Sequence, residues 1–427
     1  MPSIPSTQLP EARTKTIWKV LNALGFVLIA AMACWIVEST TSPDFALLGW
    51  RAVWFPAMPT KYLMPWPHFG LDFMFNFAAV HTRAGGGNPY QLINLSFAEP
   101  RYVFPPILLH LFSWTSLIEW DMAREAVDLW MIILCALGTV AGIGAVNNRY
   151  SLGVTSVPAS LVVALFLCST PFLFELERGN CNMLILGCIM AGVAMLNKRS
   201  TMADLVASLL FAIAIWIKLY PGLLIIGLLA LRRWRVTTLT IIGCFLIGLL
   251  DWALLAEYIP VLRQYAEKGG WSFANHAHSM TRNWDAIWST LHLPIARQIP
   301  AIGWTLLAII PPLAFVSFRV FCSTRRDDLA LLLLLWITSV ATFVPSVSFD
   351  YNLIFLVIAL LIAWDASHPL WLQALFAVQL YWLQPFAIPF TPTWLTYWLK
   401  LSGVVVVALV LVRLAGSNRP ANPNMTQ

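Results

Sequence analysis

Long apolar runs recur along almost the whole chain of 427 residues. A helix needs about 20 apolar residues to cross the hydrocarbon core of a bilayer. Charged residues make up only 11% of the sequence, against about 25% in soluble domains, which excludes a soluble globule. The sequence therefore predicts one all-α, polytopic membrane unit of about 10–12 spans. The runs that we expect to cross or enter the membrane are Ile17–Val37, Glu125–Val146, Ala159–Phe174, Met183–Leu196, Val236–Leu255, Ala301–Phe321, Leu329–Val344, Leu353–Trp364, Leu370–Leu383 and Trp394–Leu414.

Short basic clusters lie between these runs and predict the orientation of the chain. Lys and Arg are enriched on the cytoplasmic side of membrane proteins, which explains the net charge of +6 without nucleic acid as a partner. We expect a cytoplasmic tail over 1–16, a single membrane domain over 17–414 with outer loops at 38–102 and 257–300, and a disordered cytoplasmic tail over 415–427. The clusters that share the cytoplasmic face are Arg13/Lys15/Lys19, Lys198/Arg199, Arg232/Arg233/Arg235, Arg325/Arg326 and Arg413/Arg419.

Two segments do not fit a simple count of spans. The 32 residues between Arg199 and Arg232 are too few for two crossings of about 20 residues each, although both flanks belong inside. They predict a helical hairpin that turns at Lys218–Pro221, partway through the membrane. The run 104–117 is short and opens with two prolines, so we predict a re-entrant segment there.

The first outer loop contains the first candidate for chemistry. Asp72 lies among apolar and aromatic neighbours, where desolvation would raise its proton affinity and favour a general base. The alternative is a helix N-cap or a solvated loop carboxylate. Farther along, Asn88, Pro89 and Tyr90 follow three glycines, a composition typical of a turn.

Ionisable and amide side chains also lie between or inside apolar runs. Such residues are costly at membrane depth, so the turn Glu177–Asn182 indicates a functional site. The alternative is an ion pair of Glu177 with Arg178, or a helix cap, that holds a tight turn. Lys218 is far from both basic flanks and should meet an anion in a cavity. Its alternative is a pairing with a protein carboxylate such as Asp251 or Asp350.

The later outer segments add amides, imidazoles and a guanidinium. Asn275, His276, His278 and Arg282 follow one another closely and favour hydrogen bonds to a polar head group. A metal is less favoured, because no Asp or Glu ligand set is nearby. Asp350 lies in the turn 346–352, where an N-cap for the next helix is an equally good interpretation.

Together these stretches resemble glycosyltransferase family eighty-seven, polytopic mannosyltransferases of the C-type glycosyltransferase fold that use polyprenyl-phosphate sugars. The resemblance covers roughly Asp72 to Arg235. This chain departs from the family pattern at Phe104 (for Tyr), at Asn180 (for Gln) and at Asp350-Tyr351-Asn352 (for Trp-Asp-His-His). The matching stretches are Asp72, Gly87-Asn88-Pro89-Tyr90, Phe104-Pro105-Pro106, Gly179-Asn180-Cys181-Asn182, Lys218 to Pro221, and Arg232-Arg233-Trp234-Arg235.

The resemblance implies a hexosyltransferase of the plasma (inner) membrane. It would transfer a hexose, with mannose expected, from a polyprenyl-phosphate-linked sugar to a hydroxyl of a glycan or glycolipid acceptor on the outer face, with inversion. Asp72 would be the base, and Lys218, Arg178 and Arg282 would offset the phosphate charge, so that no metal or cofactor is expected. The substrate-binding residues would be Asn88, Tyr90, Asn180, Asn182, Tyr220, Asn275, His276, His278, Asp350 and Asn352.

Two other functional classes compete with this interpretation. A transporter or flippase of lipid-linked or small polar substrates would show paired broken helices in two halves, and no matching second half is visible. A polymerase or ligase of lipid-linked glycans would depend on the loop from His276 to Arg282 rather than on Asp72.

Overall fold

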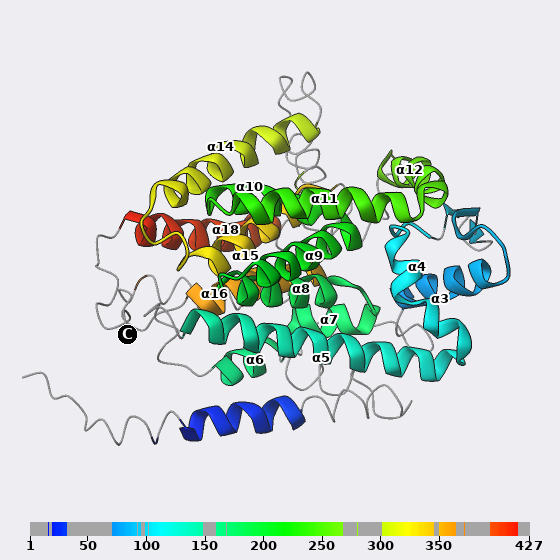
Figure 1. The fold of residues 1–427 in the computed structure, drawn as a ribbon, viewed down its shortest axis with the longest axis horizontal. Coiled ribbons are helices and arrows are strands. Elements are labelled where there is room, and N and C mark those ends of the chain that lie inside the picture. Colours follow the sequence, from blue (N-terminus) through cyan, green and yellow to red (C-terminus); the bar gives the residue numbers. More distant parts are fainter. Residues whose placement is uncertain are drawn as a thin grey trace, which may run out of the picture.

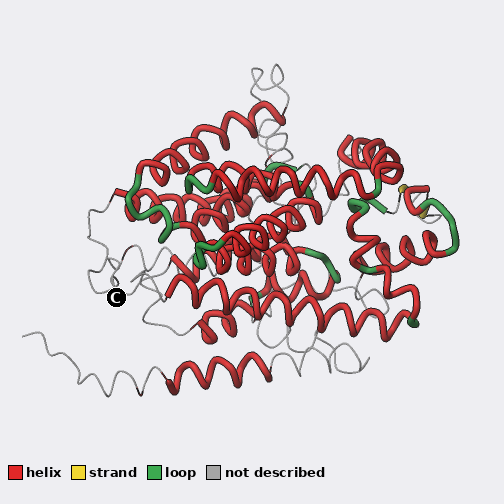
Figure 2. Tube along the Cα trace, viewed as in Figure 1, coloured by secondary structure: helices red, strands yellow, loops and turns green. Residues whose placement is uncertain are grey.

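Helices make up nearly all of the described structure (Figures 1 and 2). The computed structural model describes residues 16, 19–31, 71–91, 93–94, 99–100, 102–147, 159–167, 169–267, 280, 301–345, 350–363, 371 and 393–416. In these residues the strands are limited to β1 (Ile93–Asn94) and β2 (Glu99–Pro100), which pair antiparallel. The predicted all-α class is confirmed.

Several helices are long and apolar enough to cross a membrane. Three qualify alone: Trp120–Ala145 within α5 (Trp120–Asn147), all of α9 (Thr201–Lys218), and Gly303–Cys322 within α14 (Ala301–Cys322). The bent pair of α11 (Trp234–Leu250) and α12 (Trp252–Glu267) would make a fourth. The chain is therefore a polytopic membrane protein, while the predicted 10–12 spans stay a prediction. The shorter apolar helices are Lys19–Ala31, α8 (Asn182–Leu196), α10 (Leu224–Ala230), α15 (Ala330–Thr342) and α16 (Ile354–Ala363). A further apolar helix, α18 (Thr393–Gly416), has 24 residues.

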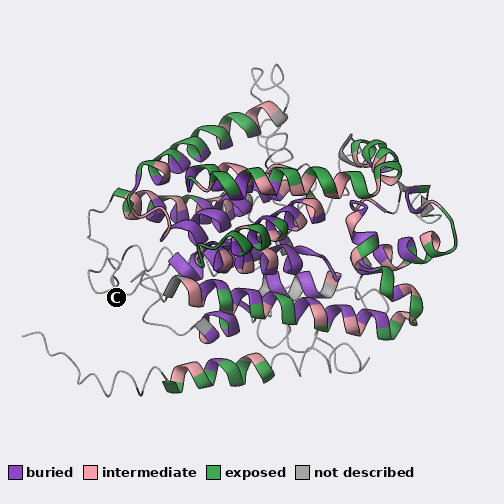
Figure 3. Cartoon of the chain, viewed as in Figure 1, coloured by how far each residue is buried: buried purple, intermediate pink, exposed green. Residues whose placement is uncertain are grey.

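The centre of the bundle is formed by helices without an exposed face. Every residue of α15 and α16 is buried, whereas the outward sides of α11 and α14 are exposed (Figure 3). Helix α8 packs against α5 through glycines: a Cβ on Gly138 would lie 2.6 Å from the backbone oxygen of Gly187. Small residues allow such close backbone contact between membrane helices. The resulting tight packing fixes the start of α8, where the site described below begins.

A turn lies where the hairpin between Arg199 and Arg232 is predicted to reverse, at Lys218–Pro221, whereas its position partway through the membrane stays a prediction, because α9 alone is long enough to cross. Helix α9 ends at Lys218, the backbone reverses at Leu219 with a positive φ of 53°, and η5 (Tyr220–Leu223) leads into α10. Arg199 and Arg233, which flank the hairpin, both bind Asp327, at 2.8 and 3.0 Å. These two predicted basic clusters therefore lie at the same end of the bundle.

The segment 104–117 contains no helix of membrane length, and its re-entrant path stays a prediction. It forms two short pieces, α4 (Ile107–Leu111) and η3 (Ser113–Leu117), of five residues each. Since a helix rises 1.5 Å per residue, neither piece can cross a bilayer.

Two of the predicted spans are not single continuous helices, so the prediction was wrong there. The run Ala159–Phe174 is divided into α6 (Ala159–Leu167) and α7 (Thr170–Arg178), because a proline in the first turn of α7 cannot continue the preceding helix. The run Val236–Leu255 bends by 97° at Asp251. The predicted first loop also contains regular structure, α3 (Leu71–Ala84) and η2 (Pro89–Gln91). The tails 1–15 and 417–427, and all but Trp371 of 370–383, lie outside the described residues.

Candidate active site

Asp72 lies in the first turn of α3 and is buried, with only 5% of its surface exposed. Its Oδ1 accepts a hydrogen bond from Arg178 Nη2 at 2.8 Å, and its Oδ2 accepts one from Asn180 Nδ2 at 2.5 Å. Charge-assisted bonds of this kind are short and fix the position of a carboxylate. Asp72 is therefore not a solvated loop residue: the structure brings it together with two other predicted site residues.

The local backbone at the end of α7 explains how Arg178 and Asn180 reach the same carboxylate. Gly179 adopts a left-handed conformation (φ 61°, ψ 38°), and its N–H bonds the oxygen of Leu176. Glycine is the usual residue at this position because it has no Cβ to clash. The chain reverses directly after Arg178, so the side chains on both sides of Gly179 point to Asp72.

Glu175, which the sequence analysis did not select, holds the other side of this turn. It is fully buried. Its carboxylate accepts hydrogen bonds from the backbone N–H of Asn182 (2.5 Å) and of Met183 (3.3 Å), and from Asn182 Nδ2 (2.9 Å). These donors belong to the first turn of α8, whose free N–H groups and dipole stabilise a negative charge. Glu175 thereby fixes α7 and α8 to each other.

Asn182 extends the network to two distant segments. Its Nδ2 donates to Asn352 Oδ1 at 2.6 Å, and its Oδ1 accepts from the Tyr220 hydroxyl at 2.7 Å. Asn352 belongs to η7 (Asp350–Leu353) and Tyr220 to η5. Three predicted substrate-binding residues therefore contact one another, although they lie far apart in the sequence.

Lys218 lies at the end of α9, next to this network. Its Nζ is 3.5 Å from Asn352 Oδ1, and its ammonium interacts electrostatically with Glu175 and, more weakly, with Asp72. The alternative that Lys218 pairs with a protein carboxylate is therefore supported, although the carboxylate is not Asp251, which binds Arg83 and His110. The side chain of Asp350 lies outside the described residues. Among the described carboxylates, Glu175 has the strongest electrostatic interaction with Lys218.

The geometry therefore combines two carboxylates and two cations in one buried network. Asp72 and Glu175 provide the negative charges, and Arg178 and Lys218 provide the positive ones. A guanidinium has five N–H donors and an ammonium has three. Such a site can hold a base beside groups that stabilise a developing anion.

A comparison with known protein families identifies the chemistry. The family model described as Glycosyltransferase family 87 matches residues 102–348, which is more than half of the chain. The chain belongs to glycosyltransferase family 87. No curated protein matches the sequence of this glycosyltransferase. The matched region starts after Asp72 and ends before Asn352, so hydrogen bonds, and not the family match, connect these two residues to Arg178 and Asn182.

Two other predicted residues of this family 87 glycosyltransferase, Asn88 and Tyr90, form a local structure of their own. Asn88 Oδ1 accepts the backbone N–H of Tyr90 (2.9 Å), and the Tyr90 hydroxyl donates to the backbone oxygen of Phe104 (2.9 Å). Burial raises the pKa of Tyr90 well above its usual range, so the hydroxyl keeps the proton that it donates. In this structure both residues fix the path of the outer segment.

Tyr102 is a second residue that sequence reasoning missed. Burial raises its pKa well above the usual range, and Cys181 and Tyr90 are among its electrostatic neighbours. Within the described part of the chain, its buried hydroxyl has no hydrogen-bond partner; neither has Asn76 Oδ1, although Asn76 Nδ2 donates to the Asp72 backbone. These two atoms provide unused hydrogen-bonding capacity near Asp72 and its turn.

The remaining predicted site residues of the glycosyltransferase stay predictions. Asn275, His276, His278 and Arg282 lie outside the described residues, and of Asp350 only the backbone is described. Among the residues that are described, no group of three His, Cys, Asp or Glu side chains could hold a metal. The expectation of no metal is not tested by this, because both histidines fall outside.

Proposed function

We propose that this glycosyltransferase moves a hexose, with mannose as the first candidate, from a polyprenyl-phosphate-sugar to a hydroxyl of a glycan or glycolipid acceptor. The proposed reaction occurs on the outer face of the plasma membrane and inverts the anomeric configuration. Family membership supports transfer of a sugar and disfavours the transporter and flippase alternative. The membrane helices fit a lipid-linked donor.

The observation that carries the proposal is the buried contact of Asp72 with Arg178 and Asn180, with Lys218 beside it. A general base needs to be ionised and fixed within hydrogen-bond reach of the proton that it removes. Arg178 and Asn180 fix the Asp72 carboxylate in place, because they bind both of its oxygens. The cations would supply a further requirement of this chemistry, which is stabilisation of a leaving phosphate.

The proposed step is a single displacement. Asp72 takes the proton of the acceptor hydroxyl while the acceptor oxygen forms a bond to the anomeric carbon. The bond between the anomeric carbon and the phosphate oxygen breaks, and the electron pair leaves with polyprenyl phosphate. The phosphate gains one negative charge, which Lys218, Arg178 and Arg282 would offset.

Transfer assays with the intact membrane protein test this function. Membranes that contain the chain are incubated with radiolabelled polyprenyl-phosphate mannose, glucose or arabinose, and the product is analysed for the acceptor and the anomeric configuration. We expect mannose to be consumed with inversion. Consumption of no polyprenyl-phosphate sugar would refute the donor class, and a retained configuration would refute the single displacement.

Asp72→Asn tests the base assignment. The amide keeps the size of the side chain but cannot accept the proton, so we expect the transfer rate to fall by about 10²–10⁴-fold, the usual contribution of a general base. Asp121→Asn is the matched control, because Asp121 is exposed in the first turn of α5. Transfer by Asp72→Asn at the rate of this control would show that the base lies elsewhere.

A further inference from the structure

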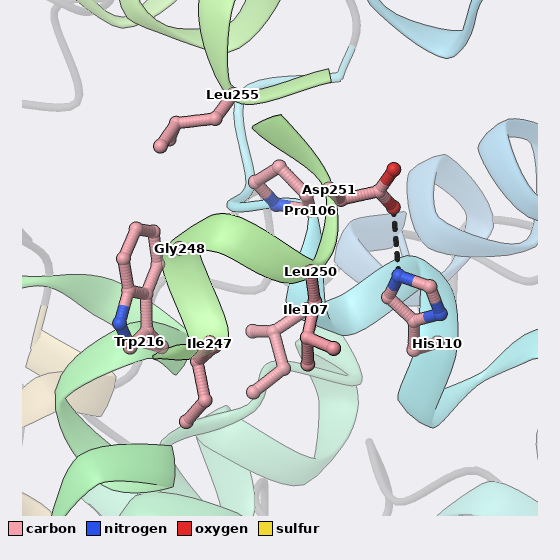
Figure 4. Close-up of a pocket in the computed structure, with 9 residues that line it drawn as sticks. All are labelled: Pro106, Ile107, His110, Trp216, Ile247, Gly248, Leu250, Asp251 and Leu255. Atoms are coloured by element: carbon pink, nitrogen blue, oxygen red, sulfur yellow. Dashed lines mark hydrogen bonds and ion pairs between the residues drawn. The ribbon is translucent and has the colours of Figure 1, made fainter. Parts of the chain in front are cut away.

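The bend between α11 and α12 is held by an ionic cluster from three parts of the chain. Asp251 separates the two helices, which meet at 97°, and α12 is seen nearly end-on beside the end of α11 in Figure 1. Asp251 Oδ2 lies 2.8 Å from Arg83 Nη2 of α3. The same oxygen lies 2.7 Å from His110 Nε2 of α4 (Figure 4). These contacts of Asp251 therefore stabilise the right angle between α11 and α12.

The same place ends the apolar surface of α11. Exposed apolar side chains follow α11 along its length and stop where Asp251, Arg83 and His110 begin. A small cleft of about 60 Å³ opens beside the bend, lined mainly by apolar residues such as Trp216 and Leu255. Since ionic side chains avoid the hydrocarbon core, the cluster indicates the level at which α11 leaves it. The large exposed apolar residues of α11 are Trp234, Ile241, Ile242, Phe245, Leu246, Leu249 and Leu250.

Helix α12 has two distinct faces on the far side of the bend. One face carries Tyr258, which is buried, and packs against the protein with half-buried apolar residues. The other exposes Trp252 (65%), Ala256 and Ile259 (55%). Positions separated by four and then three residues share one helix face. An apolar stripe therefore continues the lipid-facing surface of α11, but at a right angle to it.

We propose that α12 lies flat in the membrane–water interface, with Trp252, Ala256 and Ile259 at the boundary between lipid head groups and acyl chains. A tryptophan at the start of such a stripe is typical of this depth, and an amphipathic helix in the membrane plane buries its apolar face about 5–10 Å into it. Arg263 follows Ile259 by four residues and ends the stripe on the same face, where its long side chain can place the charge among the head groups. Glu257 is exposed to one side of the stripe. We expect the apolar side chains to carry the contact without a requirement for anionic lipid.

Helix α3 also connects the bend to the candidate site. Arg83 is bound at the bend, and Asp72 lies eleven residues earlier in the same helix. At 1.5 Å per residue, the two residues are about 16 Å apart along α3. The interfacial position of α12 itself does not rest on the proposed transfer reaction.

Depth-dependent fluorescence quenching tests the proposal. The full chain, with a small fluorescent amino acid in place of Ala256, is reconstituted in phosphatidylcholine vesicles that carry a doxyl quencher at acyl carbon 5 or 12. The matched control carries the same probe in place of Glu257, which is exposed about 100° farther around the helix. Thermal unfolding of both variants is compared with that of the wild type to verify the fold.

We expect the probe at 256 to be quenched at least twofold more by the carbon-5 lipid than the probe at 257, and the probe at 257 to be quenched more by aqueous iodide. Equal quenching of both probes, or stronger quenching at 256 by iodide than by lipid, would overturn the interfacial placement. Stronger quenching by the carbon-12 lipid would show that α12 enters the core instead. Quenching that required added phosphatidylglycerol would refute the apolar character of the contact.

Discussion

Replacing Glu175 with glutamine would test whether the turn that presents Arg178 and Asn180 depends on a buried negative charge. The carboxylate accepts three hydrogen bonds, two of them from the backbone at the start of α8. Glutamine can keep the two backbone bonds through its oxygen, but its NH₂ group would face Asn182 Nδ2, which is also a donor. Turning the Asn182 amide around would relieve this conflict only by losing the bond to the Asn352 oxygen, whereas the Tyr220 hydroxyl could accept instead of donating.

The size of the effect follows from these contacts. Hydrogen bonds to charged groups contribute about 1.5–3 kcal/mol each, and here one bond is lost and two become neutral. We expect Glu175→Gln to lower the free energy of unfolding by about 2–4 kcal/mol. A shift of the turn by less than 1 Å would misalign Asp72 and reduce kcat by about 10–100-fold, while KM for the acceptor changes by about twofold or less.

Two measurements on the reconstituted enzyme check this reasoning. Unfolding in detergent is followed by the apparent melting temperature, and steady-state transfer separates kcat from KM. Glu119→Gln is the control, since Glu119 is exposed before α5. An unchanged melting temperature and kcat in Glu175→Gln would show that the charge has no role in fixing the turn. A lower melting temperature with unchanged kcat would restrict Glu175 to stability alone.

Three further substitutions probe the remaining parts of the site and its support. Lys218→Met should raise KM for the lipid-phosphate donor by about tenfold or more and leave KM for the acceptor nearly unchanged; equal effects on both substrates would contradict the phosphate role. Tyr102→Phe removes a buried hydroxyl without a hydrogen-bond partner, so the free energy of unfolding should change by less than about 1 kcal/mol. A lower transfer rate of this variant, measured over a range of acceptor concentrations, would show that the hydroxyl binds substrate. Gly138→Val should destabilise the α5–α8 contact by several kcal/mol, about the cost of overpacking, which would be measured as a lower melting temperature. Gly144→Val is the control and should lower the melting temperature far less, because a Cβ at Gly144 meets nothing within 4 Å.

Most of the helices could be predicted from the sequence because each depends on local composition. The ends of α8, α15 and α16 differ from the predicted runs by only one or two residues. The hairpin at Lys218 followed from length alone, since two full spans cannot fit between the basic flanks. Helix α3 was missed because its 14 residues mix apolar, aromatic and polar side chains and do not form a membrane-length run.

The sequence contains residues that could have predicted the breaks in these two spans. Ser169, Thr170 and Pro171 form a typical helix start inside an apolar stretch, and Asp251 is a charge at the end of another. Glu175 could have been selected for the same reason, because a carboxylate between Phe174 and Leu176 is costly unless it is paired. What the sequence does indicate directly is that these residues need partners.

The identity of those partners could not be predicted from spacing. Asp72 and Arg178 are 106 residues apart, and Asn182 and Asn352 are 170 apart. Such contacts depend on how the helices pack against one another, which no local pattern specifies. The sequence therefore indicated most of the described site residues as candidates, but it could not show that Arg178 binds the proposed base or that Glu175 faces Lys218.

The long separation between Asn182 and Asn352 also has a consequence for biosynthesis. During translation at about 5–20 residues per second, α7 and α8 enter the membrane many seconds before η7 leaves the ribosome. Throughout that interval the polar groups of Glu175, Asn182 and Lys218 lack the Asn352 oxygen that later binds two of them. The nascent chain must therefore keep these groups hydrated or covered by other factors, and a polypeptide that stops before residue 350 cannot complete the network.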